Sequence, residues 1–265
     1  FILIQKIVKN DLVYGIFCNA GYGQFGAVED LTRTLICEQF ETNIFGHIEL
    51  INLFIPFMRK QNEGRIIFNS SVLGLVSFPF SSAYNATKFA MEAFARSLRL
   101  ELKKTNIKVS LIEPGPIEAN FNINALKNLK RIKINNSIYK DKYYKIMKYL
   151  VSGEDFFTLP ALSVAKKVHI ALISKKPKTQ YFVTLPTYVL SYLRILPNPI
   201  FENFLSLLDN QRKNNWKIMR SSSLVIIAIF LFFSYPIYAA ESFIFSGKIK
   251  CELSATFIVF DFDNK

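Results

Sequence analysis

The sequence has 265 residues, of which 51% are hydrophobic and 20% charged, a composition that fits one large globular domain and an additional segment. Its three cysteines are odd in number and share no short metal-ligand spacing, so we exclude a disulfide framework, expect no metal site and infer a reducing compartment. The net charge of +13 is carried largely by residues 121–150, where eight Lys or Arg accompany only Asp141; because no recognition motif accompanies this charge, we expect no nucleic-acid partner.

Strand-like and helix-like segments alternate along the chain. Strands are expected at residues 12–18, 65–71, 107–114 and 180–186, and helices at 38–61, 82–104 and 161–174, with a basic helical insert before the last helix. Apolar strands separated by helices of this length indicate a parallel sheet with both faces covered. The predicted fold class is therefore a doubly wound α/β sheet.

The glycine-rich stretch after the first strand, "CNAGYGQFGAVED", contains Gly21, Gly23 and Gly26 in the spacing G-x-G-x-x-G. A dinucleotide-binding turn with this spacing opens a helix, is followed by a second strand and has an acid about 20 residues further on. Here the next strand begins only near residue 65, and the acid at the right distance, Glu41, lies in a helical pattern. We therefore interpret the stretch as a loop after a buried strand.

The C-terminal part departs from the alternating pattern. Residues 224–240, "LVIIAIFLFFSYPIYAA", form 17 residues without a charge, and Met219-Arg220 precedes them. This is either a membrane anchor or a signal peptide of a second reading frame joined near Met219, with a buried helix as the third alternative. We divide the chain into a domain at 1–211, a basic linker at 212–223, the apolar segment at 224–240 and a tail at 241–265. Because the chain begins at Phe1, inside an apolar run, we expect it to be a fragment.

Two residues in the helix 82–104 point to proton-transfer chemistry. Tyr84 and Lys88 are four positions apart and share one helix face, where an ammonium can lower the pKa of a phenol enough for exchange with an alcohol or carbonyl oxygen. Tyr144 and Lys148 have the same spacing. Ser71, at the end of a strand, lies 13 residues before Tyr84, whereas a basic residue of the insert lies 13 before Tyr144. We therefore assign the site to the first pair and a surface helix to the second.

From about residue 11 to 186 the chain resembles the short-chain dehydrogenase/reductases, in particular the branch of the 17-beta-hydroxysteroid dehydrogenases. The resemblance is carried by "CNAG", "ETNIFG", "NSSVLG", "YNATK" and "EPGPIE", in this order and spacing. It implies a Rossmann fold in which Tyr84 is the general acid/base and Lys88 lowers its pKa and holds the nicotinamide ribose. It also implies that Ser71 hydrogen-bonds the substrate carbonyl, next to Tyr84, and that Asn43 helps to hold a proton-relaying water.

The same resemblance implies a nicotinamide cofactor, NAD or NADP. Asn19, Ala20 and Gly21 match the N-A-G motif beside the adenosine half, and the backbone of Pro114, Gly115 and Ile117 is expected beside the carboxamide. Ala119 stands where the family commonly has a threonine that bonds this group. The family's phosphate turn, T-G-x-x-x-G-x-G, does not occur in the 265 residues. We expect the first strands, and the residue that selects NAD or NADP, to be missing, the fragment to be inactive and the strand 12–18 to be an exposed edge.

The predicted function is hydride transfer between a nicotinamide cofactor and an alcohol or ketone. Residues 116–160 fall where the family has its substrate lid, and their Phe, Ile, Leu and Tyr residues favour an apolar substrate such as a steroid-, retinoid- or lipid-like carbonyl. The alternatives are an inactive relic and a membrane-associated basic binding protein. The expected location is cytoplasmic, while membrane association through 224–240 and homo-oligomer formation stay open.

Overall fold

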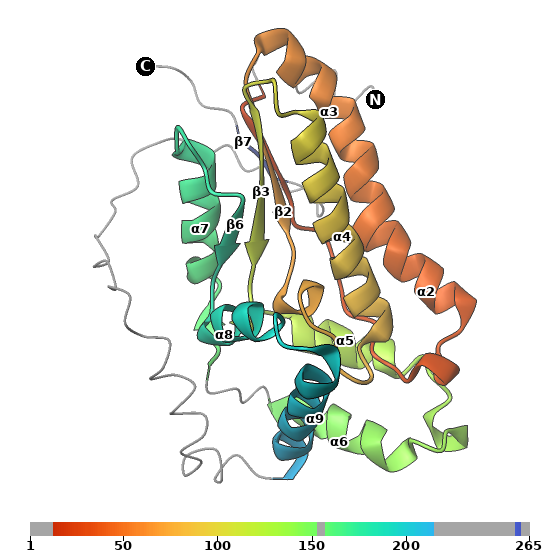
Figure 1. Ribbon diagram of the computed structural model, residues 1–265. Coiled ribbons are helices and arrows are strands. Elements are labelled where there is room, and N and C mark those ends of the chain that lie inside the picture. Colours follow the sequence, from red (N-terminus) through yellow and green to blue (C-terminus); the bar gives the residue numbers. More distant parts are fainter. Residues whose placement is uncertain (1–12, 153–156, 215–257, 261–265) are drawn as a thin grey trace. The chain divides into compact units, whose positions relative to one another are not determined.

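The core of the protein is a sheet of four parallel strands. The computed structural model describes residues 13–152, 157–214 and 258–260 (Figure 1). The parallel strands are β1 (Gly15–Cys18), β2 (Gly64–Asn69), β3 (Ile107–Glu113) and β6 (Gln180–Phe182). The sheet order is β6-β3-β2-β1-β7, and Ile16 of β1 is in register with Ile66 of β2. The predicted parallel α/β architecture is confirmed.

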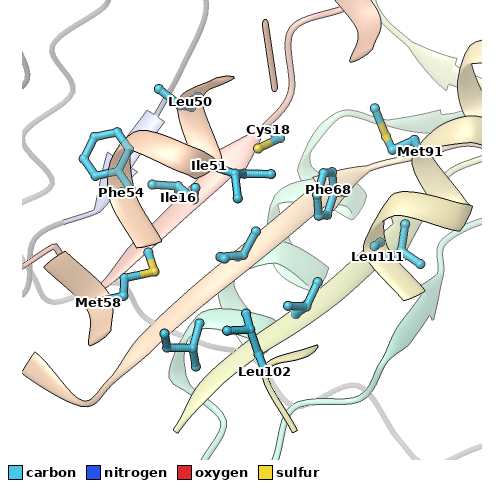
Figure 2. Close-up of a cluster of buried hydrophobic side chains, with 14 of the residues drawn as sticks. Ile16, Cys18, Leu50, Ile51, Phe54, Met58, Phe68, Met91, Leu102 and Leu111 are labelled. Atoms are coloured by element: carbon cyan, nitrogen blue, oxygen red, sulfur yellow. The ribbon is translucent and has the colours of Figure 1, made fainter. Parts of the chain in front are cut away.

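One face of this sheet is covered by α3 (Gly46–Gln61) and α4 (Ser82–Glu101), which lie side by side along the strands (Figure 1). Figure 2 shows the hydrophobic cluster between these helices and the sheet. Ile16 and Cys18 of β1 and Phe68 of β2 meet Phe54 of α3 and Met91 of α4 there. Ile16 and Cys18 are two positions apart and both reach this cluster, because alternate side chains of a strand point to the same face. α2 (Arg33–Phe40) precedes α3 and is joined to it by a π turn, Glu41–Phe45.

The opposite face is covered by α7 (Leu162–Ile173). The intervening strand residues, Phe17 of β1 and Ile67 of β2, pack there with Ala171 and Leu172 of α7. Both faces of the strands are therefore buried, which explains why their sequences are continuously apolar instead of alternating. The segments that position the site thus rest on a sheet fixed from both sides.

The edge of β1 is not exposed as the sequence suggested. β7 (Ile258–Phe260) pairs with it in the antiparallel direction, with Phe17 opposite Ile258. The expectation of an unpaired edge is therefore wrong. The sequence could not indicate this pairing, because β7 lies in the tail assigned outside the domain and antiparallel addition needs only three residues of extended backbone.

The basic insert forms a helical hairpin at the carboxyl edge of the sheet. It contains α5 (Phe121–Leu129), a 3-10 turn at Ile134–Asn136 and α6 (Lys140–Ser152), between the short strands β4 (Ile117–Glu118) and β5 (Leu159–Pro160), which pair in parallel. Two polar contacts fix this hairpin to the region before α3. The buried Tyr143 hydroxyl donates to Asp30 at 2.7 Å, and Arg131 forms two bonds with Glu38 at 2.6 and 3.0 Å.

The remaining described elements are α8 (Leu185–Leu193), α9 (Asn198–Asn214) and 3-10 turns at Val28–Asp30 and Val72–Gly74. By their contacts, the described residues up to Ser191 together with β7 form one compact unit, and the other described residues from Tyr192 onward, including α9, form a second. The apolar segment 224–240 lies outside the described residues. Among the helices that are described, none is both long and apolar enough to span a bilayer.

Candidate active site

The candidate site lies at the carboxyl ends of β1, β2 and β3. Asn69 at the end of β2 donates through Nδ2 to Asn19 Oδ1, after β1, at 2.7 Å. The backbone N–H of Val72, after β2, donates to the carbonyl of Pro114, after β3, at 2.8 Å. Three segments that are far apart in the sequence are thereby joined at one edge, where doubly wound sheets bind their ligands.

Ser71 and Tyr84 meet at this edge. Both side chains are buried, and hydrogen bonding by Ser71 lowers the pKa of Tyr84 while burial raises it more strongly, to about 12. Ser71 Oγ also accepts the backbone N–H of Leu73 at 3.1 Å, which leaves its own proton available to donate. A serine that caps the turn after β2 is thus oriented toward a tyrosine at the start of α4.

Lys88 lies one turn after Tyr84 and is also buried. Its Nζ donates to the carbonyl of Asn69 at 2.7 Å and lies 5.5 Å from the centroid of the Tyr84 ring. Burial lowers the pKa of Lys88 to about 8, and the charge of Glu92, a buried residue one turn further on, opposes that shift. The expected lowering of the Tyr84 pKa by Lys88 is not found: burial determines the direction, since it disfavours the charged form of either group.

Asn43 lies in the π turn and its side chain is occupied. Its Oδ1 accepts the backbone N–H of Tyr22, and its Nδ2 donates to Tyr22 O and to Thr87 Oγ1, all at 3.1 Å. The buried Gln39 side chain accepts the N–H of Gln24 at 2.7 Å, and it donates to Tyr22 O. The loop containing Asn19–Gly21 is therefore anchored to the helix by two amides. The sequence identified Asn43 but not Gln39.

His47, on the same helical segment, is a buried residue beside the site. Burial, together with the positive charge of Lys88, lowers its pKa to about 4. His47 is therefore neutral at physiological pH and belongs to the core. In the described part of the chain, no group of three or more His, Cys, Asp or Glu residues could hold a metal ion.

The segment after β3 lies close against the residues that follow β6. A Cβ atom at Gly115 would lie 2.2 Å from Thr184 Oγ1, so only glycine fits without a shift of the neighbouring loop. Pro114, Gly115 and Ile117 are partly exposed at this edge, and Ile117 pairs with Leu159 in the small second sheet. These three residues are thus partly accessible to solvent, while Ala119 is exposed.

Aromatic rings border the tyrosine on the side of the lid. The centroid of the Phe121 ring, at the start of α5, lies 5.3 Å from that of Tyr84, and the Phe25 ring lies 6.5 Å away. Neither residue was singled out in the sequence, although Phe121 lies within the segment 116–160 assigned as a lid. The second tyrosine-lysine pair is elsewhere: Tyr144 is 49% exposed on α6 and bonds Asn135 at 3.3 Å, as expected for a surface helix.

Known proteins are similar to this chain in sequence and in fold. Residues 3–130 match the family model for short chain dehydrogenase. The uncharacterized oxidoreductase YbbO of Escherichia coli is 39% identical over 75% of this chain and 69% of that protein. Human 17-beta-hydroxysteroid dehydrogenase type 1 is 29% identical over 74% of this chain and 60% of that protein.

Solved structures agree on the fold. A short-chain dehydrogenase from Streptomyces avermitilis has a TM-score of 0.62 at 22% identity, over 81% of this chain and 76% of that one. A short chain dehydrogenase/reductase from Burkholderia phymatum, in complex with NAD, has a TM-score of 0.59 at 22% identity, over 69% and 65% of the two chains. Together with the extent of the identity to YbbO, these matches show that the chain belongs to the short-chain dehydrogenase/reductase family of oxidoreductases.

Proposed function

We propose that this site transfers hydride between a nicotinamide cofactor and an alcohol or ketone, with Tyr84 as the general acid/base. The observation that carries the proposal is the meeting of Ser71 and Tyr84, both buried and hydrogen-bonded, at the carboxyl edge of the sheet, with Lys88 one turn away. A buried phenol with a pKa of about 12 stays protonated at neutral pH, so it is ready to donate to the oxygen of a carbonyl that is being reduced.

Ser71 is proposed to hold the substrate oxygen beside Tyr84. Its oxygen already accepts the Leu73 N–H, so its proton can be shared with a carbonyl oxygen that also faces the tyrosine. Two donors that converge on one oxygen stabilise the negative charge that develops there during reduction. In the oxidation direction, the deprotonated form of Tyr84 would accept the proton of an alcohol held by Ser71.

Lys88 fits a cofactor ribose. An ammonium has three donors, and within the described residues Lys88 uses one of them on Asn69 O. The other two can bond ribose hydroxyls, and the exposed Asn19–Gly21 loop and the Pro114–Ile117 backbone offer further contacts at the same edge. When bound, the nicotinamide supplies or accepts the hydride. Relatives in fold have been solved with NADP+ and with NAD, which supports the cofactor class but does not select between them.

Asn43 is proposed to act through its backbone. Both side-chain N–H groups of Asn43 are used on Tyr22 and Thr87, and its Oδ1 accepts from Tyr22, so we place a relay water near Lys88 on the backbone carbonyl instead. The π turn at Glu41–Phe45 supports this role, because such turns shift a carbonyl away from its regular helical partner and are frequent at functional sites.

The substrate is proposed to be an apolar carbonyl or alcohol, of the steroid, retinoid or lipid type. Phe25 and Phe121 provide the aromatic surroundings of Tyr84 that an apolar group would contact. A buried hydroxyl pair among aromatic rings favours a substrate with one polar oxygen on an apolar body, since further polar groups would lose their hydration without replacement.

The 265-residue chain is expected not to bind NADH or NADPH measurably. The sequence contains no T-G-x-x-x-G-x-G turn, and the sheet neighbour of β1 is β7 in the antiparallel direction. No described residue therefore supplies, beside β1, the helix start after a parallel strand that would bind the phosphates. Calorimetric titration of the chain with each cofactor measures this directly. Micromolar affinity for either one would contradict the expectation.

The proposed function is tested by comparing two neighbouring serines in a form of the protein that carries the family's phosphate turn. Ser71→Ala should lower ketone reduction by about a hundredfold, a loss similar to that of one oxyanion donor. Ser70→Ala is the matched control, since Ser70 is also buried but its hydroxyl lies beside Gly74. If Ser71→Ala kept the turnover of the wild type, the role of Ser71 would be refuted. If Ser70→Ala lost as much turnover as Ser71→Ala, the effect would be structural.

A further inference from the structure

The helical hairpin α5–α6 carries an uncompensated positive charge. Seven exposed lysines lie on it or in its connecting segment: Lys127, Lys130, Lys133, Lys140, Lys142, Lys145 and Lys148. Within the described ranges, none of the seven belongs to an ion pair, whereas the neighbouring Arg131 is paired with Glu38. Lys142 instead lies over the rings of Phe80 and Tyr139, at 5.7 and 5.2 Å. This charge is therefore directed to solvent or to a partner.

The outer face of α6 is defined by its helical periodicity. Tyr143 and Leu150 are buried against the hairpin, and at 100° per residue the opposite side presents Lys145 and Lys148 around the single acid Asp141, with Tyr144 beside them. The hairpin also exposes large apolar side chains: Ile138, just before α6, is 83% exposed and Ile123 on α5 is 55% exposed. Lysines mixed with exposed aliphatic residues are typical of helices that lie in a membrane interface.

A hollow of about 450 Å³ is formed by the connecting segment of the hairpin and α6. Lys130, Lys133 and Asn135 from the connecting segment line it together with Tyr144 from α6, and Ile134 and Met147 provide apolar surface. Ammonium and amide donors beside aliphatic carbon match the chemistry of a phosphate headgroup and the glycerol and upper acyl carbons attached to it. The hollow and the exposed lysines thus favour the same kind of ligand.

We propose that this hairpin face, from Ile123 to Lys148, docks on the surface of an anionic phospholipid bilayer, with headgroup phosphates in the hollow. The hairpin is held to the body by Tyr143–Asp30 and Arg131–Glu38, and Phe121 at its start contacts the Tyr84 ring. Docking would therefore bring the candidate site next to the phase that dissolves an apolar carbonyl. This consequence rests on the proposed function, but the docking itself does not.

Sedimentation of the full 265-residue chain with vesicles tests the proposal. Binding is compared between vesicles of phosphatidylcholine and vesicles that also contain phosphatidylglycerol; the apolar segment 224–240 is present throughout, so the difference isolates the charge. Replacing Lys130, Lys133, Lys145 and Lys148 by Gln should reduce the extra binding to anionic vesicles at least about tenfold. The matched control, Lys103, Lys104, Lys175 and Lys176 to Gln, removes four equally exposed charges from other helix ends and should change it less than about twofold.

A second measurement locates the contact. In a background with Cys37→Ser and Cys251→Ser, an environment-sensitive dye on Ile138→Cys should shift to shorter wavelength with anionic vesicles, whereas a dye on Leu100→Cys, 73% exposed on α4, should not. Equal binding by the two quadruple variants, or a shift only at residue 100, would overturn the proposal. So would displacement by a soluble DNA duplex without any shift at residue 138, which would indicate a general polyanion site. None of these outcomes depends on turnover, so failure here leaves the proposed function untouched.

Discussion

Tyr84→Phe should abolish nearly all ketone reduction in an active form of the protein while leaving the fold intact. The substitution removes only the hydroxyl, and loss of a general acid lowers turnover by about 10²–10⁴-fold. The ring stays in contact with Phe25 and Phe121, so the packing of the site is preserved. Single-turnover reduction of an apolar ketone, followed by cofactor absorbance, measures the loss.

The chain provides its own control for this experiment. Tyr144→Phe removes the hydroxyl of the second tyrosine that precedes a lysine by four residues, but Tyr144 is half exposed on α6 and bonds only Asn135 among the described residues. Its turnover should stay within about twofold of the wild type. Similar losses from both substitutions would show that Tyr84 has no special role.

Lys88→Met should produce the second large effect, a loss of turnover combined with a gain in stability. The folded-state pKa of Lys88 is about 8, below its ordinary value of 10.5, because burial disfavours the charge. At pH 7 Lys88 is charged in both states, but the unfolded chain binds the Lys88 proton more tightly than the folded protein does. The buried charge therefore destabilises the fold. Removing it should raise the free energy of unfolding by about 1–3 kcal/mol, after allowance for the lost bond to Asn69 O.

The stability of the two proteins should also depend on pH in different ways. The wild type should gain stability as the pH rises from about 8 toward 10.5, where the unfolded lysine also loses its proton, and Lys88→Met should lack this gain. Urea denaturation at a series of pH values measures the difference. Lys148→Met, at an exposed position on α6, is the control and should follow the wild type. Parallel curves for wild type and Lys88→Met would contradict the assigned pKa.

Much of the fold and of the site could be predicted because the signals were local. Four apolar strands separated by helical patterns fixed the parallel sheet, and parallel strands bring their carboxyl ends to one edge. Ser71 at the end of β2 and Tyr84 at the start of α4 meet there for that reason. The false fingerprint at Gly21–Gly26 was also recognised from context, since no strand follows it before β2.

What sequence reasoning missed depends on burial and on contacts between distant segments. The spacing of Tyr84 and Lys88 suggested attraction between phenolate and ammonium, but burial raises one pKa and lowers the other. Glu92, whose charge opposes the shift at Lys88, carries no motif of its own. The Tyr143–Asp30 bond spans 113 positions and has no periodic signature. Such features follow from the folded packing and not from any pattern along the chain.

The antiparallel strand β7 has a consequence for how the chain reaches this fold. Its partner β1 lies near the opposite end of the sequence, so the pairing closes a loop of almost the entire chain, one of the slowest contacts to form. The parallel pairs β1–β2 and β2–β3 need much shorter loops and can assemble first. During that interval the free side of β1 can accept an extended segment of another molecule as readily as its own. Protein concentration during refolding therefore decides between a correctly closed sheet and intermolecular strand exchange.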